Sequence, residues 1–182
     1  GLPGATQTRL IAEGFGAACG LFVGSEAETE RRPSQAQADN IKVCVRIRPQ
    51  SEREAAEGDP ICVRRGASQD SLLLQQPSGG TKSSTFDWVL SGDDAQDRVY
   101  EELGHRMVQG VTEGFHGCAL AYGQTSSGKS HTIFGGRQEA RGLLPRLVEG
   151  LFTELRLSSA DHLVKVSYLE IYNEKVRDLL TP

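Results

Sequence analysis

The sequence has 182 residues, 37% of them hydrophobic and 24% charged, with a formal net charge of −4. This length suits a single domain that buries roughly 70% of the surface of its unfolded chain, and the acidic balance disfavours a protein that binds nucleic acid or anionic lipid through bulk charge. No apolar run approaches the roughly 20 residues of a membrane-spanning helix, and the four cysteines form no CxxC pair, so neither a zinc site nor a disulfide framework is predicted.

The first 38 residues differ in composition from the rest. GFGAACGLFVG, residues 14–24, is mildly apolar, but no basic region precedes it as a secretory signal requires. SEAETERRPSQAQAD, residues 25–39, has almost nothing to bury, and this composition is typical of a disordered segment. We therefore expect the folded domain to begin near Asp39.

A strand is predicted where the composition changes. In NIKVCVRIRP, residues 40–49, β-branched residues alternate with polar ones, and a proline ends the run. Weaker strands are predicted near 61–63 and 71–74, followed by a turn-rich stretch at 76–84. A helix is expected over 93–111, because its apolar residues recur at helical spacing and acidic residues concentrate near its start.

The stretch CALAYGQTSSGKSHT, residues 118–132, joins an apolar strand to a glycine-containing loop. CALAYG is apolar on both faces, which is typical of a central parallel strand covered by helices on both sides. The loop matches GxxxxGK[ST], and a strand before it and a helix after it are the context that a phosphate-binding loop needs. We therefore interpret Gly123–Ser130 as a phosphate-binding loop.

Each residue type in this loop has a chemical reason. Gly123 and Gly128 let successive backbone N–H groups point at anionic oxygens, where a Cβ would obstruct them. Lys129 would place a positive charge against the β- and γ-phosphates, and Ser130 would offer a hydroxyl to Mg²⁺. The residues that fill the loop between them are Gln124, Thr125, Ser126 and Ser127. Ser126 and Ser127 would act mainly through their backbone amides, since small polar side chains also simply suit a turn.

An amphipathic helix over 142–157 and a strand from residue 162 to a charged turn are predicted next. Walker-type enzymes also use an aspartate after an apolar strand to hold the magnesium shell. No strand-Asp-x-x-Gly element lies between Ser130 and the end of the sequence. Glu170 and Glu174 are substitutes by chemistry, but structural roles in the strand and the turn are favoured for both.

From about Asn40 to Leu180 the sequence resembles the kinesin motor domain. KVCVRIRP is similar to the family's opening strand with its R-x-R-P signature, and TFDWVL followed by QDRVYEE is similar to its F-D-x-V-F block and the next helix. GFHGCALAYGQTSSGKSHTIFG resembles the family's phosphate-loop block, RGLLPR matches G-I-I-P-R, and VSYLEIYNEKVRDLL matches S-Y-x-E-I-Y-N-E-x-I-x-D-L-L. Five blocks in the family's order make coincidence implausible.

The resemblance implies a P-loop NTPase fold, which is a three-layer α/β/α arrangement around a central, mostly parallel sheet. It also implies ATP and Mg²⁺ as ligands, microtubules as the partner and the cytoplasmic microtubule cytoskeleton as the location. Arg46, Arg48 and Pro49 match the signature beside the adenine, where Arg46 and Pro49 would pack on the ring. The less favoured alternative is that the two arginines merely solvate one face of a strand. His131 and Thr132 match positions next to the nucleotide, although a histidine early in a helix is usually only a surface residue.

The resemblance covers about half of the family's motor core. The first switch, N-x-x-S-S-R-S-H, and the second, D-L-A-G-S-E, occur nowhere in the 182 residues. We therefore expect residues 39–182 to be the N-terminal half of a motor domain, as a fragment or a truncated gene model, after a lead-in at 1–38 that is disordered or foreign to the family. No catalytic residue is assigned, and microtubule-stimulated ATPase activity is expected only of the complete motor domain.

Two functions remain open. The first is the ATP-binding part of a kinesin-like motor that moves along microtubules when complete. The second is a truncated nucleotide-binding remnant without motor activity. A nucleotide or small-molecule kinase would share only the phosphate loop and has no support from the other blocks. Oligomeric state, cargo and direction of travel are not determined by these residues.

Overall fold

The computed structural model of the chain describes residues 6–12, 17–25 and 41–181. The chain divides into two compact units. The first consists of residues 1–34 and 96–182, and the second consists of residues 35–95. We call the first the loop unit, because it contains the phosphate-loop sequence, and the second the signature unit, because it contains the R-x-R-P sequence. Among the helices of the described residues, none is long and apolar enough to cross a membrane.

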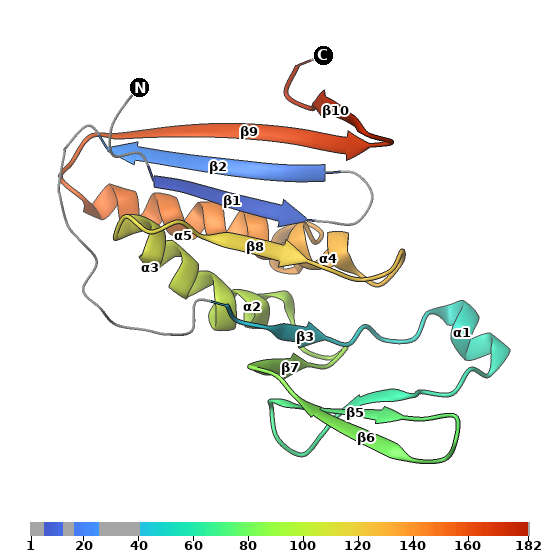
Figure 1. Cartoon of the computed structure of the whole chain (residues 1–182). Helices are drawn as coiled ribbons and strands as arrows, with labels where there is room; N and C mark the ends of the chain where they lie inside the picture. The colour runs from blue at the N-terminus through green and yellow to red at the C-terminus, as the bar shows by residue number, and fades with distance from the viewer. Residues whose placement is uncertain (1–5, 13–16, 26–40, 182) are drawn as a thin grey trace. The chain divides into compact units, whose positions relative to one another are not determined.

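The loop unit is built on a five-stranded sheet in the order β10-β9-β2-β1-β8 (Figure 1). Its strands are β1 (Thr6–Ala12), β2 (Ala17–Ser25), β8 (Cys118–Ala121), β9 (His162–Tyr172) and β10 (Lys175–Asp178). β8 pairs with β1 in parallel, whereas the β1–β2, β2–β9 and β9–β10 pairs are antiparallel. The mixture of helices with parallel strand pairs is the predicted α/β class, although a single pair of the described strands in this sheet is parallel.

Strands begin earlier in the chain than Asp39, where composition predicts the folded domain to start. β1 and β2 form a hairpin that lies between β8 and β9, with Arg9 paired to Cys118 and Gly20 paired to Ser167. Composition underestimates such a segment because strand formation depends on the neighbouring strand as much as on intrinsic propensity. The most polar part of the predicted lead-in, residues 26–38, lies outside the described residues.

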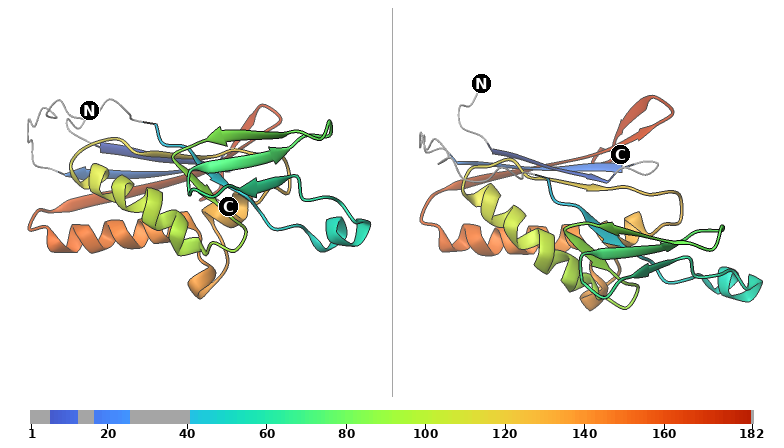
Figure 2. Two further views of the ribbon diagram at one scale, coloured as in Figure 1. Left: turned by 90° about the horizontal axis from the view of Figure 1, so that it is seen from below. Right: turned by 60° about the horizontal axis from the view of Figure 1, so that its bottom comes forward.

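β8 is an edge strand of the described sheet and not the central, doubly covered strand predicted from its apolar run. Among the described residues its strand partner is β1, and exposure alternates along it, with Cys118 and Leu120 exposed. Helices α3 (His105–Thr112) and α5 (Leu143–Leu157) lie on one face of the sheet (Figure 2). The two helices therefore cover one face of the sheet, and apolar side chains of β8 remain exposed.

A helical run occupies most of the segment predicted to be helical at 93–111. It consists of α2 (Gln96–Val99), the π-helical turn η1 (Tyr100–Gly104) and α3. Tyr100 lies against Gly104 and also against Gly150 of α5, since a Cβ built on either glycine would overlap its side chain. Two glycines thus make room for one aromatic ring between the two helices.

The helix predicted over 142–157 is confirmed as α5, and its apolar face forms the core of the loop unit. Leu143, Leu147 and Leu151 recur every four residues and are buried. Leu151 clusters with the buried Val111 of α3, and Val164 of β9 packs against this pair. The core therefore joins both helices to the sheet.

The signature unit contains two small sheets and one short helix (Figure 1). β3 (Cys44–Arg46) pairs in parallel with β7 (Trp88–Leu90), and the second sheet is antiparallel, with β4 (Val63–Arg65), β5 (Ser71–Gln75) and β6 (Thr81–Thr85). Helix α1 (Glu52–Glu57) follows β3. Only three residues of the strand predicted at 40–49 enter the ladder, because the partner β7 is itself three residues long.

Candidate functional site

The phosphate-loop sequence follows β8 and leads into α4 (Lys129–Ile133), in the order strand, loop, helix that the motif predicts. Gly123 and Gly128 have φ angles of 155° and 96°, values that residues with a Cβ rarely adopt. A Cβ on Gly123 would also overlap the hydroxyl oxygen of Ser127, which lies against it. Glycine is therefore required where the chain leaves the strand and folds back.

Lys129 is held over the loop by the loop's own backbone. Its Nζ donates hydrogen bonds to the carbonyl oxygens of Gly123 at 2.7 Å and of Gln124 at 2.8 Å. The N–H of Ser127 donates to the same Gln124 oxygen at 3.2 Å, and Ser126 takes a positive φ of 66°. The loop is thus a closed turn with an ammonium group bound to its carbonyl side.

The remaining predicted loop residues lie on the surface. The exposed members of the predicted set in the loop and the first turn of α4 are Gln124, Thr125, Ser126, Ser130 and His131. Gln96 of α2, with an exposed fraction of 5%, donates from Nε2 to the carbonyl oxygen of His131 at 2.6 Å and lies 3.4 Å from its ring nitrogens. The buried amide of Gln96 therefore anchors the helix that begins with Lys129, a role that no sequence motif indicates.

Residues 46–49, the R-x-R-P signature, lie in the signature unit at and after the end of β3. Arg46 is half-buried, and its Nη2 donates to the carbonyl oxygen of Asp94 at 3.4 Å. Burial lowers the pKa of the Arg46 guanidinium, and the nearby Asp94 carboxylate partly offsets this shift. Pro49 packs against Gly92, because a Cβ built there would lie 3.1 Å from the proline Cδ.

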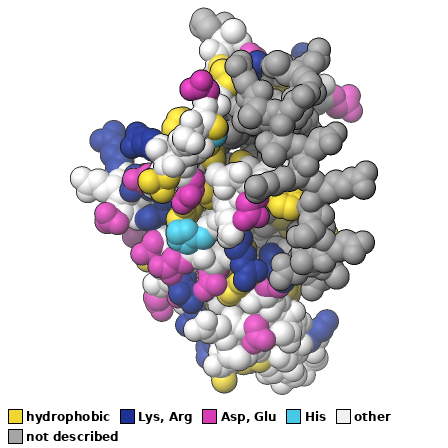
Figure 3. All heavy atoms as spheres, turned by 90° about the vertical axis from the view of Figure 1, so that its left-hand side faces the viewer, with side chains coloured by type: hydrophobic (Ala, Val, Ile, Leu, Met, Phe, Trp, Pro, Cys, Tyr) yellow, Lys and Arg dark blue, Asp and Glu magenta, His cyan; other side chains and the backbone are white. Residues whose placement is uncertain are grey.

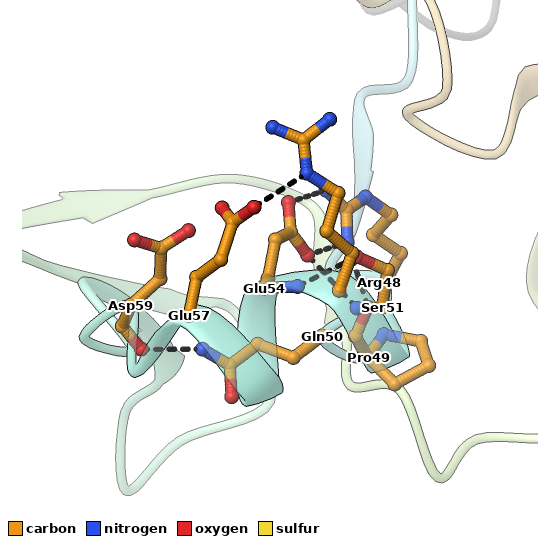
Figure 4. A network of polar contacts seen from close by, with 8 residues as sticks. Arg48, Pro49, Gln50, Ser51, Glu54, Glu57 and Asp59 are labelled. Carbon is orange, nitrogen blue, oxygen red and sulfur yellow. Dashed lines mark hydrogen bonds and ion pairs between the residues drawn. The ribbon is translucent and has the colours of Figure 1, made fainter.

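Arg48 is bound to the carboxylate of Glu54 in α1 by two hydrogen bonds (Figure 4). Its Nη1 lies 2.7 Å from Oε2 and its Nη2 lies 2.5 Å from Oε1, and Nη1 also donates to the carbonyl oxygen of Pro49 at 2.9 Å. The hydrogen bonds from Arg48, followed by those from Ser51, lower the pKa of Glu54 to about 2. Arg48, which the sequence predicts beside the adenine, is therefore already paired within its own unit.

Glu54 also closes a capping box at the start of α1. Its carboxylate accepts a hydrogen bond from the N–H of Ser51 at 2.8 Å, and its own N–H donates to the Ser51 hydroxyl at 3.3 Å. Neither α1 nor Glu54 is part of the sequence-based prediction. The signal exists nevertheless, since Ser51-Glu-Arg-Glu54 matches the S-x-x-E pattern of such a cap.

Comparison with known proteins assigns these features to a family. The family model described as the kinesin motor domain matches residues 46–182. The chain belongs to the kinesin motor-domain family. Similar proteins include kinesin-like protein KIF1A of Rattus norvegicus, 36% identical over 156 residues, kinesin-like protein KIF16B of Homo sapiens, 38% over 161, and kinesin-like protein Klp68D of Drosophila melanogaster, 39% over 163.

These kinesin-like relatives are much longer than the chain. The three alignments cover 79%, 78% and 84% of this chain but only 9%, 12% and 21% of the relatives. The chain therefore spans about a tenth to a fifth of the length of the kinesin-like proteins it matches. The kinesin match includes both the phosphate loop and the R-x-R-P signature, whereas β1 and β2 lie upstream of it. Membership of the kinesin motor-domain family carries the P-loop NTPase fold with it and confirms the predicted fold class.

Proposed function

We propose that this chain is the ATP-binding part of a kinesin-like motor, in which hydrolysis of ATP drives movement along microtubules in the cytoplasm. The observation that carries the proposal is the geometry of the loop after β8. Two glycines take positive φ angles, and the ammonium group of Lys129, the first residue of α4, is bound to two loop carbonyls at 2.7 and 2.8 Å. Ligands of open α/β sheets bind at the carboxyl ends of strands, and this loop follows the carboxyl end of β8.

Each residue of the loop then has a task at the phosphates of ATP. Lys129 leaves the carbonyl oxygens of Gly123 and Gln124 and donates to β- and γ-phosphate oxygens, because an ammonium group is attracted more strongly to an anionic phosphate oxygen than to a neutral peptide carbonyl. Backbone N–H groups of residues 124–128 bind further phosphate oxygens. The first N–H groups of α4 are available as well, since they have no acceptor inside the helix. His131 lies next to the nucleotide in this arrangement.

Ser130 fits a magnesium site as a single oxygen ligand. Ser130 is exposed and follows Lys129 directly, so its hydroxyl is a free oxygen donor beside the proposed phosphate positions. Mg²⁺ is commonly held by few protein oxygens together with phosphate oxygens and water. Accordingly, the described residues contain no cluster of three or more His, Cys, Asp or Glu that would form a metal cage. A bound Mg²⁺ would neutralise charge on the β- and γ-phosphates.

We assign the adenine to Arg46 and Pro49 of the signature unit. The Pro49 ring is exposed and has a fixed backbone φ, so it presents a rigid apolar face to a flat base. The Arg46 guanidinium is planar and stacks on aromatic rings. Arg46 is the last residue of β3, and its hydrogen bond to the Asp94 carbonyl holds its side chain there. Pro49 follows three residues later in the chain.

Replacing Lys129 tests this proposal directly. Charge-assisted hydrogen bonds are worth about 1.5–3 kcal/mol, so Lys129→Ala is expected to weaken ATP binding about 10- to 150-fold. The measurement is a titration with a fluorescent ATP analogue and Mg²⁺. Lys175→Ala is the matched control, because Lys175 is an exposed lysine of the same unit in β10. Unchanged affinity in Lys129→Ala would exclude the loop as the phosphate site.

The alternative function is a truncated nucleotide-binding remnant without motor activity. Neither switch sequence of the kinesin family occurs in the 182 residues. The coding sequence downstream of Pro182 distinguishes the two functions. An open reading frame that continues into both switches supports the motor, whereas a stop codon directly after Pro182 supports the remnant.

The charge distribution bears on the microtubule partner. On the face drawn in Figure 3, acidic and basic side chains are interspersed, in keeping with the net charge of −4. Association with an acidic filament is favoured by a surface of one positive sign. We therefore propose that the face drawn in Figure 3 is not the main microtubule contact of the motor, and we assign no nucleic acid or membrane partner to the described residues.

A further inference from the structure

Arg48, Glu54 and the turn between them form a hydrogen-bond network (Figure 4). The guanidinium of Arg48 uses both Nη atoms on the Glu54 carboxylate, in the bidentate geometry that makes such pairs specific. Its Nη1 also binds the carbonyl oxygen of Pro49, and the same carboxylate holds the N–H of Ser51. Pro49 and Ser51, the neighbours of Gln50, are therefore both held by the Arg48–Glu54 pair.

Pro49 is held on two sides as a result. Its carbonyl oxygen is fixed by Arg48 at 2.9 Å, and its ring lies against Gly92, where a Cβ would come within 3.1 Å of Cδ. A rigid ring fixed in this way offers one face to a ligand without further loss of conformational entropy on binding. The orientation of that face depends on the hydrogen bonds of Arg48, since the proline itself cannot donate one.

We propose that Arg48 and Glu54 form a clasp that positions Pro49 for the adenine of the nucleotide, and that Arg48 itself does not contact the base. This inference rests on the proposed function, namely ATP binding. It changes the role of Arg48 from a binding residue, as the R-x-R-P signature predicts, to a positioning residue. It also adds Glu54, which lies outside that signature, to the residues on which adenine recognition depends.

The chemistry of the pair supports positioning over stability. Both side chains are about one-third exposed, and ion pairs at such positions contribute little to the stability of the fold. The same helix contains a second pair, Arg53–Glu57 at 2.8 Å, which joins two residues four positions apart within α1 itself. α1 therefore offers a matched comparison between a clasp and an ordinary surface ion pair.

The test compares two ligands that share the triphosphate and differ in the base. Affinities for ATP and for inorganic triphosphate are measured by competition with a fluorescent ATP analogue on the full chain. Arg48→Ala and Glu54→Ala are each expected to lower the ATP-to-triphosphate affinity ratio by up to about fivefold, the upper limit set by breaking an exposed ion pair. The double variant is expected to lose no more than either single variant, because each substitution opens the same clasp.

Glu57→Ala serves as the control and is expected to leave the ratio unchanged. If Arg48→Ala lowers the ratio while Glu54→Ala leaves it unchanged, Arg48 contacts the nucleotide itself and the clasp is wrong. Losses that add in the double variant overturn it as well. Amide exchange at Ser51, expected to be faster in both single variants and unchanged in Glu57→Ala, checks the turn without nucleotide.

The proposed function fails by a different outcome. If the wild-type chain binds no ATP, or if Lys129→Ala leaves ATP binding unchanged, the phosphate-site assignment falls and the clasp falls with it. If ATP binding depends on Lys129 but the affinity ratio is the same in all clasp variants, the clasp alone is wrong.

Discussion

Lys129 has hydrogen-bond partners before any phosphate arrives. Its ammonium group is bound to the carbonyl oxygens of Gly123 and Gln124, so nucleotide binding at the proposed site is an exchange of partners. Phosphate oxygens carry formal charge and are better acceptors than peptide carbonyls. The net gain is smaller than the sum of the new bonds, because two existing bonds are lost. Because of this exchange, the loss of ATP affinity in Lys129→Ala is smallest, about 10-fold, where the two lost carbonyl bonds offset most of the gain.

The Arg48–Glu54 pair opens only in strong acid, and its small contribution to stability is lost there. The pKa of Glu54 is lowered from 4.5 to about 2 in the folded chain, chiefly by the hydrogen bonds from Arg48. A lowered folded-state pKa means that the stabilisation is fully present above about pH 4.5 and is lost as the pH falls towards 2. We expect an NMR titration of the Glu54 carboxyl carbon to give an apparent pKa near 2, and Arg48→Ala to raise it. A wild-type value near 4.5 would contradict the paired geometry.

At the scale of elements, the contact between η1 and α5 depends on small residues. Tyr100 lies where side chains of Gly104 and Gly150 would otherwise be, and burial raises the pKa of its phenol. π-helical turns inside helices often mark sites under a specific structural constraint. Here the constraint is steric, because one ring occupies the space between two helices.

Gly150→Ala is therefore expected to destabilise the loop unit even though alanine favours helices. The new Cβ would overlap the Tyr100 hydroxyl, and overpacking typically costs about 1–3 kcal/mol. Better helix propensity offsets up to about 1 kcal/mol of this cost. With the full offset, we expect a net loss of up to about 2 kcal/mol in urea unfolding.

Gly110→Ala in α3 is the matched control for this substitution. A Cβ at Gly110 would lie 3.9 Å from the nearest atom, in Phe115, which is an ordinary contact. The control is expected to gain up to about 1 kcal/mol from helix propensity alone. Equal effects of the two substitutions would show that Tyr100 does not fill the space beside Gly150.

At the scale of the whole molecule, the 182-residue chain contains one wall of the proposed catalytic site. In-line attack on a γ-phosphate requires a positioned water and charge stabilisation from several directions. In the proposed function, the loop at residues 123–130 provides one of these contributions, and neither family switch sequence occurs in the 182 residues. We expect phosphate release by this chain to show no stimulation by microtubules.

The measurement is phosphate release with and without microtubules, together with co-sedimentation. A kinesin motor domain that contains both switch sequences is the positive control, and Lys129→Ala sets the background. Stimulated turnover near the rate of the positive control would refute the requirement for the switches. ATP binding without turnover would agree with a loop that binds phosphates and cannot complete the reaction.

Local features of this protein were predictable because their causes are local. The spacing of glycine, lysine and serine over residues 123–130 defines a turn whose φ angles and donors depend on those eight residues alone. The predicted order of strand, loop and helix is found, as is the amphipathic helix α5. The family was predictable for a related reason, since five blocks in a fixed order identify a kinesin motor domain without any knowledge of packing.

Partners distant in the sequence were decided only by the tertiary structure. Alternating residues predict a strand but not the strand beside it, so the pairing of β8 with β1, upstream of the family match, could not be derived. The same holds for the Gln96 amide that binds the carbonyl of His131. The sequence by itself determined the family and the conformation of the phosphate loop, because both depend on neighbouring residues. The sheet order and the contact of Gln96 with His131 required the structure, because each depends on which groups the fold brings within hydrogen-bond distance.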